Sequence, residues 1–211
     1  QEATRVADKA IMEKAEALRA AGKLLDLTAI KAQLAEPRPQ YVALPKASRK
    51  SLAPAAVAVR GRAAHLQMGW YYKCPRCNNW HVNLAAGYAL TADGVAATCE
   101  HVVQPSADMR EGYFIAASED GEVFAVTAVL AKSQRLDTAV VKLESAHLTP
   151  LPLNDQVRPG DSAYCFSRPL GQAGYFSDGM INRFYWTRVE HAKASNPLDA
   201  VRYLRMNVST D

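Results

Sequence analysis

From residue 54 onward the chain is a succession of short runs rich in Val, Tyr, Phe, Trp and Thr, several of them bounded by Gly, Pro, Asn or Asp. Such runs are typical of β-strands, and no segment with helical periodicity interrupts them. Regularly spaced short strands predict a barrel or a sandwich. A Pro-Leu-Asn-Asp segment near 152–155 separates a larger, earlier group of strands from a smaller, later one. The expected strands are 55–60, 65–73, 80–91, 94–98, 112–117, 122–131, 138–143, 162–167, 174–187 and 201–208.

Residues 2–36 have a different pattern, which predicts helices. Apolar residues recur at a spacing of seven, at Ile11, Leu18 and Leu25. Gly22 is expected to end a first helix, and Asp26 or Thr28 to cap a second. We favour a helical hairpin packed on the main domain, with an oligomerisation arm as the alternative. The following residues 37–53, with three prolines, are expected to form a linker.

The charge pattern and the lengths of the apolar runs argue against two classes of function. The net charge is +4, with both signs interspersed, whereas a nucleic-acid-binding protein usually carries a basic stripe with aromatic residues between the charges. No apolar run approaches the ~20 residues that a membrane-spanning helix needs. We expect no nucleic-acid partner, no membrane span and no cofactor. The chain begins with Gln1, which fits removal of a secretory signal as well as an arbitrary starting point.

Two residues have the chemistry of a proton-transfer pair. His101 follows a predicted strand, in Thr-Cys-Glu-His-Val-Val, and Asp137 opens the run Asp-Thr-Ala-Val-Val-Lys-Leu. A neutral imidazole accepts a proton from a hydroxyl at neutral pH. A carboxylate is needed to hold its tautomer and to stabilise the imidazolium. By itself, such a pair also fits a surface histidine and an aspartate that caps a strand.

Four segments, in order, resemble bacterial trypsin-like serine proteases of the HtrA type. Residues 87–103 resemble the segment around their catalytic histidine, and residues 136–143 the segment around their catalytic aspartate. Residues 157–165 and 176–182 are similar to two strands of their second barrel. The match in order and spacing covers residues 55–211.

This resemblance implies an all-β chymotrypsin-like fold of two six-stranded barrels, the second incomplete, with an N-terminal helical extension. The expected domains are a helical extension (1–36), a linker (37–53), a first barrel with His101 and Asp137 (54–149) and a partial second barrel (150–211). The expected function is a serine endopeptidase, periplasmic or secreted, that cleaves peptides or proteins by acyl transfer. His101 would be the general base and then the general acid, and Asp137 would orient it.

The nucleophilic serine is expected beyond Asp211. No Gly-x-Ser-Gly-Gly element is present. Ser162 follows Gly-Asp but lacks the two glycines and continues into a strand. Ser209 lies in a segment that resembles the part of the family upstream of the nucleophile. The alternative function is a catalytically inactive protease-fold module that binds peptides or partners, and the sequence after Asp211 distinguishes the two.

The cysteines leave several interpretations open. Cys74 and Cys77 form a Cys-x-x-Cys motif between two predicted strands, which fits a small disulfide, part of a zinc site or a redox pair. The disulfide is favoured if the chain is exported. A zinc site would add His81 and Cys99, and a zinc-dependent structural module is a third possible function. Otherwise we expect Cys99, like Cys165, to be a buried core residue.

Overall fold

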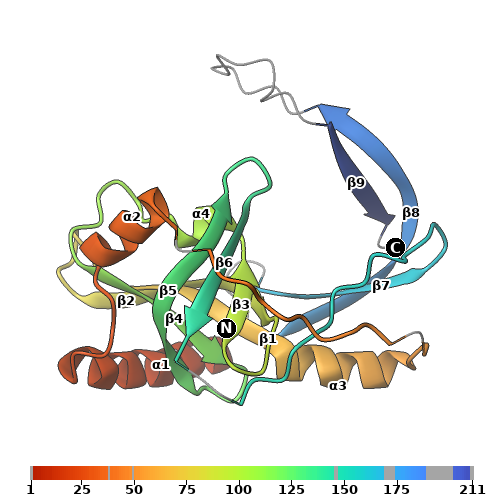
Figure 1. Ribbon diagram of the computed structural model, residues 1–211. Helices are drawn as coiled ribbons and strands as arrows, with labels where there is room; N and C mark the ends of the chain where they lie inside the picture. Colours follow the sequence, from red (N-terminus) through yellow and green to blue (C-terminus); the bar gives the residue numbers. More distant parts are fainter. Residues whose placement is uncertain are drawn as a thin grey trace. The chain divides into compact units, whose positions relative to one another are not determined.

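The strand-like runs between residues 65 and 143 close into a barrel (Figure 1). The computed structural model describes residues 2–37, 39–48, 50–144, 147–168, 174–188 and 202–209. The barrel has the strand order β1-β2-β3-β6-β5-β4, and its neighbouring strands are antiparallel. Its strands are β1 (His65–Lys73), β2 (Trp80–Ala89), β3 (Val95–Thr98), β4 (Gly112–Ser118), β5 (Val123–Ser133) and β6 (Thr138–Leu143).

Alternate residues of these strands fill the interior, because successive side chains of a strand point to opposite faces. Met68, Phe114 and Val141 are among the fully buried members of this core. Helix α2 (Leu27–Ala35) contributes Leu27, Ile30 and Leu34 to the same cluster. The second N-terminal helix is therefore part of the barrel core and not a separate appendage.

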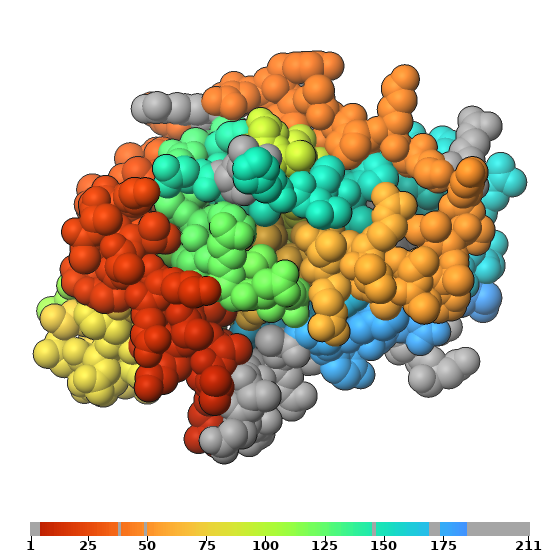
Figure 2. All heavy atoms as spheres, turned by 90° about the horizontal axis from the view of Figure 1, so that it is seen from below, coloured from red at the N-terminus to blue at the C-terminus, as the bar shows by residue number. Residues whose placement is uncertain are grey.

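Helix α1 (Glu2–Ala20) covers part of the outside of the barrel. Ile11 and Ala15 form a second buried cluster with outward-facing residues that include Tyr71 and Ile115. Figure 2 shows α1, in red, beside the yellow tip of the β1–β2 hairpin, where the Arg19 guanidinium lies 5.0 Å from the centre of the Trp80 ring. Both faces of β1 are consequently covered, which explains its nearly continuous burial.

The ends of the two N-terminal helices follow local chemistry. Gly22 adopts a φ of 66°, and the N–H of Lys23 donates to the carbonyl of Leu18, which is the expected glycine-type helix end. The Asp26 side chain accepts a hydrogen bond from the N–H of Ala29 at 2.7 Å, so Asp26 is the N-cap of α2. No described helix combines the length and the apolar character that crossing a membrane would require.

The predicted strand at 55–60 is wrong, because this segment belongs to helix α3 (Pro54–Ala64). Val57 and Val59 suggested a strand, but Pro54 occupies the first turn of the helix, where proline is favoured. Most of the remaining residues are alanines, which have the highest helix propensity. The first strand of the barrel therefore begins at His65.

The chain divides into two compact units, residues 1–153 with 166–175 and residues 154–165 with 176–211. The later strands β7 (Ser162–Ser167), β8 (Tyr175–Arg188) and β9 (Arg202–Ser209) form a three-stranded sheet in that order. Within the second unit the rings of Tyr164 and Phe176 stack at 5.6 Å, and the N–H of Gly160 donates to the carbonyl of Ile181. A second closed barrel stays a prediction.

Candidate active site

His101 lies on a one-turn helix, α4 (Glu100–Val103), directly after β3. The two residues that anchor this turn are Val103, which is fully buried in the barrel core, and Glu100, which is 4% exposed. Glu100 accepts a hydrogen bond from the side-chain amide of Gln104 at 2.6 Å. The imidazole of His101 is exposed, so a rigid turn presents a solvent-accessible ring.

The strand pairing brings Asp137 to the same place. β3 and β6 are neighbours, with Thr98 opposite Ala139. His101 follows Thr98 by three residues and Asp137 precedes Ala139 by two, so both lie where these paired strands meet the loops. Asp137 has a φ of 47°, a left-handed conformation that aspartate tolerates better than most residues.

The two side chains are in direct contact. The Nδ1 atom of His101 lies 2.7 Å from Oδ2 of Asp137, and the backbone N–H of His101 donates to Oδ1 at 3.0 Å. The backbone N–H is the largest cause that lowers the pKa of Asp137 below 3.8, and the His101 ring adds to this effect. An ionised carboxylate only accepts hydrogen bonds. Nδ1 of His101 is therefore the donor in this contact, and Nε2 lies outside it.

Cys99 lies beside this pair and not in the core as expected. It is exposed, and its sulfur, a ring nitrogen of His101 and a carboxylate oxygen of Asp137 lie within 4.8 Å of one another. β3 ends at Thr98, so Cys99 precedes the helical turn as its N-cap residue and escapes the inward alternation of the strand. Partial burial raises the pKa of the Cys99 thiol, and the charge of Asp137 raises it further. Cys99 is thus a protonated donor to Asp137 and not a thiolate.

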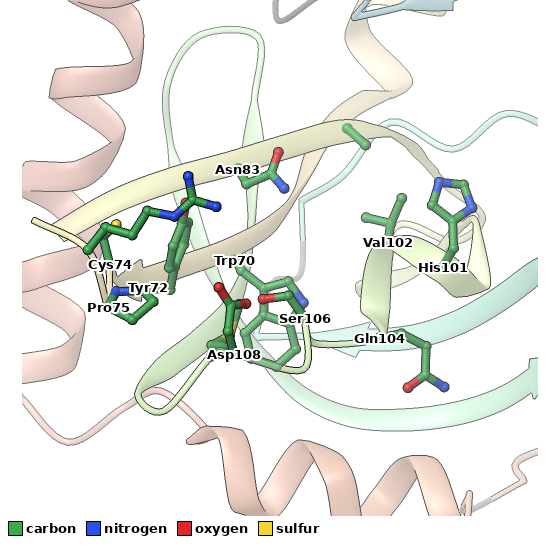
Figure 3. A pocket seen from close by; sticks show the side chains of 13 residues that line it. Trp70, Tyr72, Cys74, Pro75, Asn83, His101, Val102, Gln104, Ser106 and Asp108 are labelled. Atoms are coloured by element: carbon green, nitrogen blue, oxygen red, sulfur yellow. The ribbon is translucent and has the colours of Figure 1, made fainter.

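A cavity of about 660 Å³ adjoins His101 (Figure 3). His101 lies at one end of it and Cys74 and Pro75 lie at the other, with Trp70 and Asn83 between them. Both β1 and β2 and the segment after α4 contribute to its walls. Two aromatic residues of β1, Trp70 and Tyr72, line the cavity. The residues that line the cavity are Trp70, Tyr72, Cys74, Pro75, Arg76, Asn83, Ala85, His101, Val102, Gln104, Ser106, Asp108 and Met109.

All four cysteines are free thiols in this structure, and the disulfide between Cys74 and Cys77 stays a prediction. Cys74, Cys77 and His81 do come together, with ligand atoms within 4.8 Å of one another. The four-residue zinc set is wrong in one member, because Cys99 belongs to the cluster with His101 and Asp137. Cys165 is exposed and not a core residue, since β7 is only partly covered along its length.

Comparison with known proteins agrees with this geometry. The model of the family described as "Trypsin-like peptidase domain" matches residues 85–205, which is more than half of the chain and includes both His101 and Asp137. A protein of Arabidopsis thaliana named "Putative protease Do-like 14" is 31% identical over 108 residues, which cover 47% of this chain and 24% of that protein. The match thus spans about a quarter of the length of this relative. The chain belongs to the trypsin-like peptidase domain family.

Proposed function

We propose that this protein is a serine endopeptidase in which His101 is the general base and then the general acid, and Asp137 is its orienter. The observation that carries this proposal is the 2.7 Å contact between Asp137 and Nδ1 of His101. This contact directs the opposite nitrogen, Nε2, away from the carboxylate with its lone pair available. A hydroxyl nucleophile needs such an acceptor to lose its proton during attack on a peptide carbonyl.

The exposure of the pair fits this role. The side chain of His101 is 69% exposed and that of Asp137 is 48% exposed, so an approaching hydroxyl has access to the ring. Among the described residues, the His101 side chain has no hydrogen-bond partner other than Asp137. A base without a competing partner at Nε2 is ready to accept a proton from an incoming group.

The cavity next to His101 supports a peptide or protein as the substrate. It offers the aromatic surfaces of Trp70 and Tyr72 and polar groups of both signs, Arg76 and Asp108 among them. Aromatic rings and charged groups together can contact both the apolar and the charged side chains of a peptide. We propose that this cavity receives residues of the substrate on one side of the cleaved bond.

We propose that the nucleophilic serine and the oxyanion hole come from residues that follow Asp211. Ser162 is the first residue of β7 and Ser209 the last residue of β9. Neither position has the Gly-x-Ser-Gly-Gly context that creates a tight turn at the nucleophile of this family. We therefore expect the nucleophilic serine in the residues that follow Asp211.

The experiment is hydrolysis of a fluorescently labelled, unfolded protein substrate by the protein extended beyond Asp211. His101→Ala is expected to lower kcat/KM by at least ~10³-fold, because the base is lost. His147→Ala is the matched control, since His147 is exposed and does not line the cavity, and it should leave the rate unchanged. Binding of the substrate without hydrolysis would overturn the proposal in favour of an inactive binding module.

A further inference from the structure

The tip of the β1–β2 hairpin gathers three metal-ligating side chains that the peptidase function does not use. We propose that Cys74, Cys77 and His81 bind a zinc ion. Their ligand atoms lie within 4.8 Å of one another, and the Cys77 sulfur lies 3.1 Å from Nε2 of His81. A tetrahedral zinc ion, with bonds of ~2.3 Å to sulfur and ~2.0 Å to nitrogen, holds its ligand atoms roughly 3.5–3.8 Å apart. Only small side-chain movements separate the observed positions from that geometry.

Backbone hydrogen bonds hold the turn that carries Cys74 and Cys77. Two of them close the turn, from the N–H of Cys74 to the carbonyl of Asn79 and from the N–H of Asn78 to the carbonyl of Cys74. Asn78 completes the turn with a φ of 57°. The turn thus holds the two thiols close to each other and to His81.

A disulfide between Cys74 and Cys77 would make no use of His81, although Nε2 of His81 lies 3.1 Å from the Cys77 sulfur. For this reason we favour the metal site over the disulfide.

The site rests on a rigid part of the fold. In the register of β1 and β2, Tyr72 lies opposite His81 and Lys73 opposite Trp80. The Trp80 ring stacks on Tyr71 at 4.5 Å, which fixes the strand next to His81. Two ligands thus come from the turn and one from the returning strand. Cys77 and His81 are exposed, so water is expected at the fourth position.

A metal ion at the hairpin tip would also fix the shape of one end of the candidate active site. Cys74 lines the same cavity as His101, at its opposite end (Figure 3). An ion bound by Cys74, Cys77 and His81 would hold this end of the cavity in one shape. The cluster of Cys99, His101 and Asp137 is a weaker candidate, because Asp137 already accepts two hydrogen bonds from His101 and the Nδ1 atom that faces it is protonated.

The test begins with the protein purified under reducing conditions and without chelators. Metal analysis should find close to one zinc ion per chain. After removal of the zinc, titration with Co²⁺ should give thiolate-to-cobalt charge-transfer absorption and the strong visible bands of four-coordinate cobalt. Cys77→Ser and His81→Ala should reduce this absorption at a given Co²⁺ concentration by at least ~10-fold, because each removes one ligand.

Cys165→Ser and Cys99→Ser are the matched controls, and both should bind Co²⁺ as the unaltered chain does. Two results would overturn the proposal. One is the absence of zinc and of cobalt bands, with Cys74 and Cys77 found as a disulfide by mass spectrometry. The other is cobalt absorption that is lost in Cys99→Ser but kept in Cys77→Ser, which would place the metal at His101. Neither result depends on peptidase activity.

Discussion

Replacing Asp137 by asparagine is expected to move the ring proton of His101 from Nδ1 to Nε2. In the structure, the two carboxylate oxygens of Asp137 accept separate hydrogen bonds from the backbone N–H and from Nδ1 of His101. An asparagine offers one acceptor oxygen and one NH₂ donor. The backbone N–H always donates and so retains the oxygen. The NH₂ group then faces Nδ1, which becomes an acceptor and gives its proton to Nε2.

The size of this effect follows from the exposure of the pair. With side chains that are 69% and 48% exposed, the hydrogen bond to Nδ1 is worth about 1–1.5 kcal/mol. Such a difference corresponds to a roughly 5- to 12-fold preference for one tautomer. We expect the Nδ1–H form to dominate by about this factor in the unaltered chain and the Nε2–H form to dominate in Asp137→Asn. In a peptidase assay this change of tautomer should lower kcat by about the same factor, and loss of the carboxylate charge that stabilises the imidazolium should lower it further.

Nitrogen–proton correlation spectra of the imidazole rings measure the tautomer directly, at a pH where His101 is neutral. The measurement needs no substrate and no nucleophile. Asp155→Asn, an exposed aspartate that does not line the cavity, is the matched control and should leave the His101 signals unchanged. A His101 ring that keeps its proton on Nδ1 in Asp137→Asn would show that Asp137 does not set the tautomer.

Three further predictions concern stability, each measured by urea denaturation. Ile30→Ala should lower the free energy of unfolding by about 2–5 kcal/mol, because Ile30 is fully buried in the barrel core. Its control, Lys31→Ala at an exposed position, should change the free energy of unfolding by less than about 0.5 kcal/mol. A small effect of Ile30→Ala would mean that α2 is not part of the core. The hydrogen bond from buried His65 lowers the pKa of Glu119 below 4.5. The stability that this bond contributes should therefore be present above pH 4.5 and be lost as the pH falls through the lowered pKa. Glu119→Gln should lose less stability over that range, and parallel curves of stability against pH for the two proteins would contradict this. Gly69→Ala should destabilise the barrel by about 1–3 kcal/mol or more, because its new methyl group would collide with the backbone carbonyl of Asn83; unchanged stability would show that β1 and β2 separate easily.

Much of the barrel was predictable because each strand carries a local signal. The run 65–73 has the aromatic and apolar residues of a buried strand, and it forms β1 with those bounds. The segment 55–60 was misread because two valines outweighed the alanines and Pro54, and in the helix that it forms Val59 is 71% exposed. Which strands pair, and that they close, depends on contacts distant in the sequence.

The candidate site, like the fold, could be predicted from the sequence only in part. His101 and Asp137 were found through residue type and resemblance, and their contact follows from the pairing of β3 with β6. The position of Cys99 was missed because it depends on a single residue, the point at which β3 ends and the helical turn begins. The cavity was also beyond local reasoning, since its walls come from β1, β2 and the segment after α4. A cavity formed by segments that are distant in the sequence leaves no recognisable sequence pattern in any one of those segments.

We propose that His101, held by Asp137, activates a serine. The most direct measurement is labelling of the protein, extended beyond Asp211, with a fluorophosphonate probe, followed by identification of the modified residue by mass spectrometry. We expect one labelled serine in the residues after Asp211, with labelling lost in His101→Ala and retained in His147→Ala. Absence of labelling, or labelling that persists in His101→Ala, would contradict it.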